Sequence, residues 1–240
     1  ATSAYTALPV GHIEPTAGHP PLWVLVLGFS SMLGFTSVAA HQMLGALVGA
    51  VGVAAVGWAG RTLDGPRTGL IAASIAAVHA CLWLSDGLVM SESLVVVGTA
   101  IVVGCAVRAY NSPETRWIIL LGLAGGLTAL VRAEMLLVLP LVALPVLRAP
   151  GIDLRRRLMR YVAIGLVAGA VLAPWAVRNM QTFEEPVLLS NGLGILLAQT
   201  NCDATYYGDK QGSWEFDCGL PQPLRSDGTP GDESEREVVY

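Results

Sequence analysis

Residues 86–93 read Asp-Gly-Leu-Val-Met-Ser-Glu-Ser, a short polar stretch between two long apolar segments, Gly69–Leu84 and Leu94–Val107. A carboxylate at the rim of a membrane span is costly to keep there. It is retained where it meets water, a partner or a substrate. We therefore predict a functional role for Glu92. Asp86, in the same polar stretch, is closer to an ordinary turn residue.

The composition is that of an integral membrane protein. Of the 240 residues, 53% are hydrophobic and only 13% are charged, whereas a soluble domain carries roughly 25% charged residues. The net charge of −4 is unevenly distributed along the chain, because residues 184–240 hold 11 of the 18 acidic residues and only three basic ones. The membrane part is therefore net basic and the tail acidic. This pattern lacks the basic patch of a nucleic-acid-binding protein.

Apolar segments divide the chain into a bundle with flanking regions. Residues 1–20 are polar, and residues 21–35 are apolar but too few for a span, which needs about 20 residues. We expect 21–35 to be an interfacial helix anchored by Trp23. Residues 36–180 are predicted to form a transmembrane bundle and residues 181–240 an extracytoplasmic loop. The bundle contains about six spans, at about 36–59, 67–84, 93–109, 116–131, 134–148 and 161–177. The expected fold is an all-α polytopic membrane protein.

The arginines orient these spans. Loops that carry many Lys and Arg residues stay in the cytoplasm. One set of predicted span ends receives nine arginines, and the other receives only Arg132 and Arg178. Glu92 then faces outward, together with residues 1–20 and the acidic tail. The nine arginines on the predicted cytoplasmic side are Arg61, Arg67, Arg108, Arg116, Arg148, Arg155, Arg156, Arg157 and Arg160.

The outward face gathers the polar residues that suit binding of a lipid-linked phosphate. Arginine presents a planar fork that matches phosphate, and a nearby carboxylate can handle protons or an acceptor. The structural alternatives are a helix-capping Glu92, arginines that snorkel to the interface, an Arg132–Glu134 ion pair and a turn at His19. The candidate residues are His19, Glu92, Arg132, Glu134, Arg178 and Asn179.

The four cysteines fall into two groups. Cys202 and Cys218 lie in the predicted extracytoplasmic loop, where oxidation is allowed, so we predict a disulfide between them. In the chain-entropy model such a bridge stabilises the fold by roughly 3 kcal/mol. Cys81 and Cys105 fall inside spans and are expected to be inert small hydrophobes. No CxxC or HExxH motif is present, and no metal site is predicted.

Several short motifs, each weak evidence for a family when taken alone, occur in a specific order along the chain and on specific predicted sides of the membrane. They are His19-Pro20-Pro21-Leu22, the run 60–67, Met90-Ser91-Glu92, the run 130–134 and the run 174–179. In this arrangement the chain resembles the GT-C membrane glycosyltransferases of the family 39 type. These are bacterial relatives of the protein O-mannosyltransferases and the aminoarabinose transferases. The loop at residues 201–205 resembles the actinobacterial branch.

The resemblance implies a GT-C-type helix bundle in the cytoplasmic (plasma) membrane. Such an enzyme transfers a sugar from a polyprenyl-phosphate donor to a glycan, lipid or protein acceptor on the extracytoplasmic side. It implies no certain cofactor, and a loosely held divalent cation stays open. The resemblance places the main catalytic Asp upstream of Ala1. We therefore expect a fragment that lacks its first transmembrane helix and its C-terminal part, and that is inactive alone.

The same resemblance assigns roles to the candidate residues. Glu92 matches an acidic position near the donor cavity and is the catalytic candidate in this chain. The remaining outward residues are expected to bind donor or acceptor: His19, Arg132, Glu134, Arg178 and Asn179.

Two other functions stay open. A transporter or flippase would also use helices broken by Gly and Pro and charges within the membrane, although here the charges lie at one rim. A non-catalytic scaffold or receptor would bind a partner through the outward loop. Substrate flux through the protein would favour the transporter. Loss of activity on Glu92→Gln with normal expression would count against the scaffold.

Overall fold

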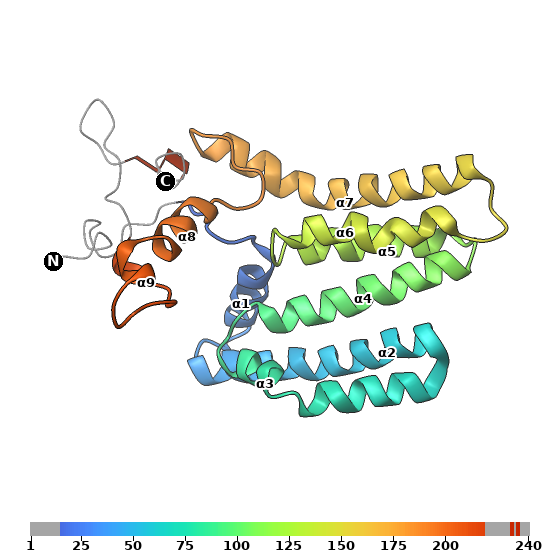
Figure 1. Ribbon diagram of the computed structural model, residues 1–240, viewed down its shortest axis with the longest axis horizontal. Coiled ribbons are helices and arrows are strands. Elements are labelled where there is room, and N and C mark those ends of the chain that lie inside the picture. The colour runs from blue at the N-terminus through green and yellow to red at the C-terminus, as the bar shows by residue number, and fades with distance from the viewer. Residues whose placement is uncertain (1–14, 219–230, 233, 236–240) are drawn as a thin grey trace. The chain divides into compact units, whose positions relative to one another are not determined.

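The structure is a computed structural model that describes residues 15–218, 231–232 and 234–235. Within these residues it contains helices and no strand, which confirms the predicted all-α fold (Figure 1). The chain divides into two compact units. The first is Pro20–Pro174, and the second combines Ala1–His19 with Trp175–Tyr240.

Among the residues that the structure describes, three helices are long and apolar enough to cross a membrane, which agrees with a multi-pass membrane protein. They are α2 (Val38–Val78), α4 (Glu92–Asn111) and α7 (Leu154–Thr182). Shorter helices accompany them in the first unit: α1 (Leu22–Met32), α3 (Ala80–Gly87), α5 (Thr115–Ala129), α6 (Met135–Ala143) and the 3₁₀ helix η2 (Leu144–Arg148).

The long element α2 is a hairpin of two helical segments. Asp64 and Gly65 leave helical geometry, and the φ of 86° at Gly65 suits a residue without a Cβ. Pro66 then begins the second segment, a position where its missing N–H costs nothing. The two segments pack closely, since a Cβ on Gly69 would lie 2.6 Å from the carbonyl oxygen of Gly57. The hairpin therefore corresponds to two of the spans predicted from sequence.

The second of those spans is shorter than expected. It ends at Val78, because His79 has an extended backbone with φ −79° and ψ 109°. The residues up to Gly87 form the separate helix α3. The sequence interpretation, which continued the span to residue 84, missed this break.

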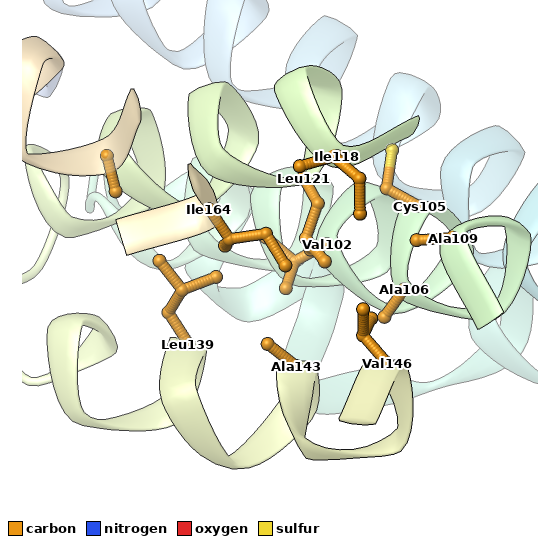
Figure 2. Close-up of a cluster of buried hydrophobic side chains, with 11 residues drawn as sticks. Val102, Cys105, Ala106, Ala109, Ile118, Leu121, Leu139, Ala143, Val146 and Ile164 are labelled. Carbon is orange, nitrogen blue, oxygen red and sulfur yellow. The ribbon is translucent and has the colours of Figure 1, made fainter. Parts of the chain in front are cut away.

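Helix α4 lies at the centre of the first unit, packed against α2 on one side and α5 on the other. Figure 2 shows the buried cluster that joins α4 to α5, α6, η2 and α7. Small side chains from α4 interlock there with larger ones from its neighbours. The cluster consists of Val102, Cys105, Ala106, Ala109, Ile118, Leu121, Leu139, Ala143, Val146, Ile164 and Ala168.

Glycines let α5 and α7 approach closely. A Cβ on Gly122 would lie 2.7 Å from both the Ile164 carbonyl oxygen and the Val167 Cβ. A Cβ on Gly126 would lie 2.9 Å from the Val171 Cβ. Small residues at such contacts are the usual basis of helix association in lipid, where burial of apolar surface gives little driving force.

The bundle of the first unit has two chemically different ends. Because the helices alternate in direction, the α2 turn, the α4–α5 turn and the η2–α7 turn share one end (Figure 1). Arg160 lies there and donates from Nη2 to the carbonyl oxygens of Ala109 and Ser112, both at 2.8 Å. The arginine-rich end is thus tied to the final carbonyls of α4, which favour a cation.

The opposite end is closed by α1. The backbone N–H of Leu22 donates to the carbonyl oxygen of Leu130 at 2.9 Å, and Trp23 Nε1 donates to that of Val89 at 3.0 Å. Trp23 is only 6% exposed. Our expectation that Trp23 anchors α1 in the lipid interface is therefore wrong, since this side chain packs within the protein.

In the second unit, the chain after α7 folds back on that helix. Trp175 Nε1 donates to the carbonyl oxygen of Leu189 at 2.8 Å, and the Asn191 N–H donates to that of Ala17 at 3.1 Å. Cys202 and Cys218 form a disulfide with Cα atoms 6.2 Å apart, the pairing expected from the sequence. The short helices of this unit are α8 (Leu193–Thr200), α9 (Asp203–Tyr206) and η3 (Phe216–Cys218).

Asp232 ties the segment around it to the residues that follow α7. Its Oδ1 accepts from the Ser234 hydroxyl at 2.6 Å, and its Oδ2 accepts from the Glu184 N–H at 3.3 Å. Partial burial raises the pKa of the Asp232 carboxyl. Hydrogen bonds from Ser234, Glu235 and Glu184 lower it by more, and the net pKa lies below the ordinary value. Asp232 therefore stays ionised at neutral pH.

We predict that Gly122→Ala separates α5 from α7 and destabilises the protein by about 1–3 kcal/mol, the usual cost of overpacking. Thermal unfolding in detergent measures the change. The matched control is Gly169→Ala on α7, where a Cβ would meet nothing within 4 Å. Equal unfolding temperatures for the two variants would contradict the close approach.

Candidate functional site

An ion-pair cluster lies at the end of the first unit that carries the α3–α4 and α5–α6 turns. The Arg132 guanidinium donates from Nη1 to Glu92 Oε1 and from Nε to Glu134 Oε1, both at 2.6 Å. The side chains of Arg132, Glu92 and Glu134 are 41%, 33% and 56% exposed. The structure thus brings together three of the residues singled out in the sequence, from segments 40 residues apart.

The α3–α4 turn positions Glu92. Ser91 is the N-cap of α4 without a side-chain capping bond, and Glu92 lies in the first turn, where the helix dipole favours a carboxylate. Just before it, Val89 has a φ of 57°, which is rare for a β-branched residue. Such strain costs of order 1–3 kcal/mol and persists only where neighbours enforce it. The Trp23 bond to the Val89 carbonyl is one such restraint.

The second carboxylate oxygen of Glu92 is chemically available. Oε2 is buried and has no hydrogen-bond partner among the described residues. The Glu92 side chain lines a small pocket together with Asp86, Ser85 and Ser93. With Oε1 held by Arg132, the Glu92 carboxylate is oriented and can accept a hydrogen bond from a hydroxyl group or take up a proton there.

Asp86, which the sequence interpretation treated as an ordinary turn residue, is built into this region. Its Oδ1 accepts from the Ser93 hydroxyl at 2.5 Å. A Cβ at Gly45 or Gly49 of α2 would collide with Asp86, so both glycines make room for it. The signal in the sequence is the spacing of these glycines four residues apart, which lets another segment approach the helix closely.

Arg178 and Asn179 belong to the second unit, where they support the local fold. The Arg178 guanidinium lies over the Trp175 ring, 4.8 Å from its centroid, and over Phe183 at 5.5 Å. Its Nη1 donates to Asn179 Oδ1 at 2.9 Å and to the Thr16 carbonyl oxygen at 3.2 Å. Asn179 is fully buried, and its Nδ2 has no partner among the described residues.

His19 lies apart from these contacts. Its side chain is exposed, and it makes no hydrogen bond or ion pair with a residue in the described ranges. Within the same ranges, no group of three or more His, Cys, Asp or Glu side chains is arranged to hold a metal ion.

An apolar groove is lined by residues close in sequence to the ion-pair cluster. It has a volume of about 710 Å³ and runs along α2, α4 and α5. Trp58 and Trp117 line it toward the arginine-rich end, and Leu22, Leu94 and Val131 line the end next to Glu92 and Arg132. No charged side chain of the described part of the chain lines the groove. A long hydrocarbon chain therefore fits its chemistry, with a polar head at the cluster.

Comparison with known families decides the class of this protein. A model of the dolichyl-phosphate-mannose-protein mannosyltransferase family matches residues 18–177, more than half of the chain. The chain belongs to this family. Neither the curated proteins nor the solved structures contain a significant match to the chain.

Membership in the mannosyltransferase family makes the protein a glycosyltransferase, and proteins of this family use lipid-linked sugar donors. The match covers His19, Glu92, Arg132 and Glu134 but stops one residue before Arg178. The roles of individual residues rest on the geometry rather than on the match.

We predict that Arg132 and Glu92 stabilise the fold jointly. Because both side chains are about a third or more exposed, a double-mutant cycle of Arg132→Ala and Glu92→Gln should give a coupling of at most about 1 kcal/mol. Unfolding in mixed micelles measures it. The control cycle, Arg116→Ala with Glu114→Gln, removes a more exposed ion pair and should give a smaller coupling. A zero coupling for Arg132 and Glu92 would contradict the pairing.

Proposed function

We propose that the protein transfers a sugar, mannose by the name of its family, from a polyprenyl-phosphate donor to an acceptor outside the cytoplasm. The observation that carries the proposal is the apolar groove whose lining includes Leu94 and Val131, close in sequence to Glu92 and Arg132 of the ion-pair cluster. A donor of this class has a long isoprenoid chain, an anionic phosphate and a hydroxyl-rich sugar. The apolar groove would accept the isoprenoid chain, the Arg132 guanidinium the phosphate, and the Glu92 carboxylate the sugar hydroxyls.

Arg132 is proposed to hold the donor phosphate. Its Nη1 and Nε are engaged by carboxylates, while Nη2 has no partner among the described residues. A guanidinium that is 41% exposed and held in place by two neighbours loses little freedom when it binds an anion. Glu134 serves in this proposal to orient Arg132.

Glu92 is proposed to accept a hydrogen bond from a sugar hydroxyl through Oε2, the oxygen that lacks a partner. Such a bond would fix the sugar relative to the phosphate. The family resemblance expects a further catalytic carboxylate, and Glu92 would assist it. A loosely held divalent cation is compatible with this role.

For the second unit we propose acceptor binding. Arg178 and Asn179 hold the segment around Thr16, three residues before the exposed His19. These contacts would shape the end of a loop that receives the acceptor, a glycan, a lipid or a protein. Residues 181–240, closed by the Cys202–Cys218 disulfide, would form the extracytoplasmic loop.

Placement in the family 39 type and its actinobacterial branch is likewise a proposal. It is supported by the order of the motifs at residues 19–22, 90–92 and 174–179 and by the loop at residues 201–205.

Glu92→Gln should lower transfer of mannose from polyprenyl-phosphate mannose by about 10- to 100-fold in the complete protein. A hydrogen bond to a charged group contributes about 1.5–3 kcal/mol, which sets this range. Transfer is measured with radiolabelled donor in membranes that contain equal amounts of each variant.

The matched control is Glu114→Gln, which removes a paired carboxylate at the other end of the bundle and should leave transfer unchanged. Full activity of Glu92→Gln would overturn the assigned role. Movement of the intact donor across the membrane without sugar transfer would instead favour the flippase.

The proposed sidedness has its own test. With Cys81 and Cys105 replaced by Ala, Leu88→Cys lies in the α3–α4 turn and Ser112→Cys follows α4. A membrane-impermeant maleimide should label position 88 in intact cells and position 112 only after permeabilisation. Labelling of both positions from outside, or the reverse pattern, would rule out an active face outside the cytoplasm.

A further inference from the structure

Helix α8 turns its hydrophobic side chains outward. Leu193, Leu196 and Leu197 are 64%, 41% and 49% exposed. Their spacing of three and four residues places them on one face of the helix. Gly194 and Gln199 on the remaining surface are buried. A helix in water buries its leucines and exposes its polar residues, so the pattern of α8 is the reverse.

The buried polar residue has a structural reason for its position. Gln199 is 3% exposed, and its Oε1 accepts from Trp214 Nε1 at 2.8 Å. Its backbone carbonyl accepts from the Glu215 N–H at 3.1 Å. Gln199 thus joins α8 to the chain that the Cys202–Cys218 disulfide closes. These contacts hold α8 in an orientation that leaves the leucine face free.

The sequence around α8 differs from the tail that contains it. Residues 184–240 hold 11 acidic residues, yet the stretch from 186 to 202 contains no charged residue. The exposed face of α8 is therefore both apolar and uncharged. This composition suits contact with lipid, whereas the acidic residues on either side of the stretch require water.

Contacts within the second unit also fix the position of α8 along the axis of α7. Trp175 lies seven residues before the end of α7, which is about 10 Å along the helix axis. It binds the carbonyl oxygen of Leu189, four residues before α8 begins. Since α7 is a candidate membrane span, the start of α8 is held beside its last two turns. Helix α8 is thereby continuous with a segment that meets the membrane surface.

We propose that α8 is an interfacial helix that lies in the membrane surface, with Leu193, Leu196 and Leu197 in contact with lipid acyl chains. The occupant of this face is the bilayer itself rather than another protein. In this position α8 anchors the disulfide-closed loop to the surface near the end of α7. The inference concerns a surface that the proposed donor site does not use.

Spin labels on α8 test the proposal in the protein reconstituted into phosphatidylcholine nanodiscs. With Cys81 and Cys105 replaced by Ala, labels are placed at Leu193→Cys, Leu196→Cys and Leu197→Cys. Asp209→Cys, in the exposed part of the same loop, is the control. The labels on α8 should be relaxed strongly by oxygen, which partitions into lipid, and weakly by a water-soluble nickel chelate. The control should show the opposite.

Two results would overturn the proposal. Strong relaxation of the α8 labels by the nickel chelate would place this face in water, and resistance to both reagents would show that protein covers it. A second measurement avoids the labels, in case they disturb the fold. The unsubstituted protein is irradiated with phosphatidylcholine that carries a diazirine in its acyl chain. Peptides from 193–200 should be modified and peptides from 203–213 should not. Equal modification of the two regions would also reject the proposal.

Discussion

Close contact between helix backbones is the constraint on which the first unit depends. Helices in lipid gain little from burying apolar surface, so they must pack closely to associate. Gly122 and Gly126 allow this between α5 and α7, and Gly69 allows it within the α2 hairpin. Gly45 and Gly49 of α2 make room for Asp86 at the end of α3, next to the α3–α4 turn. The same small residues that hold the bundle together therefore decide where the polar turns lie.

Those turns carry an unusual balance of charge. One guanidinium serves two carboxylates, so Glu92, Arg132 and Glu134 together carry a formal charge of −1. In the proposed function, an anionic donor would meet both attraction to Arg132 and repulsion from its partners. The donor phosphate would compete with Glu92 and Glu134 for the Arg132 guanidinium.

The sequence was sufficient where a local pattern determines the structure. Apolar length predicted the long apolar helices α2, α4 and α7, whereas the spans predicted at 116–131 and 134–148 correspond to shorter helices. Gly65 with Pro66 marks the α2 turn. Long-range contacts were beyond it. Nothing near Trp23 in the sequence indicates a bond to Val89, 66 residues away, and nothing beside Arg178 indicates stacking on Phe183. The strained backbone of Val89 and the close contact of Asp86 with Gly49 likewise depend on tertiary packing.

The unequal lengths of the helices bear on the bilayer around the protein. Helix α4 has 20 residues and matches a hydrocarbon thickness of about 30 Å, whereas the 15 residues of α5 cover only about 22 Å. A membrane that meets a short helix thins locally, at a modest cost in elastic energy. Arg132 follows α5 by three residues. Where α5 faces the bilayer, the hydrophobic mismatch would draw the polar headgroup layer toward the cluster, and in the proposed function this would shorten the path of a lipid phosphate to Arg132.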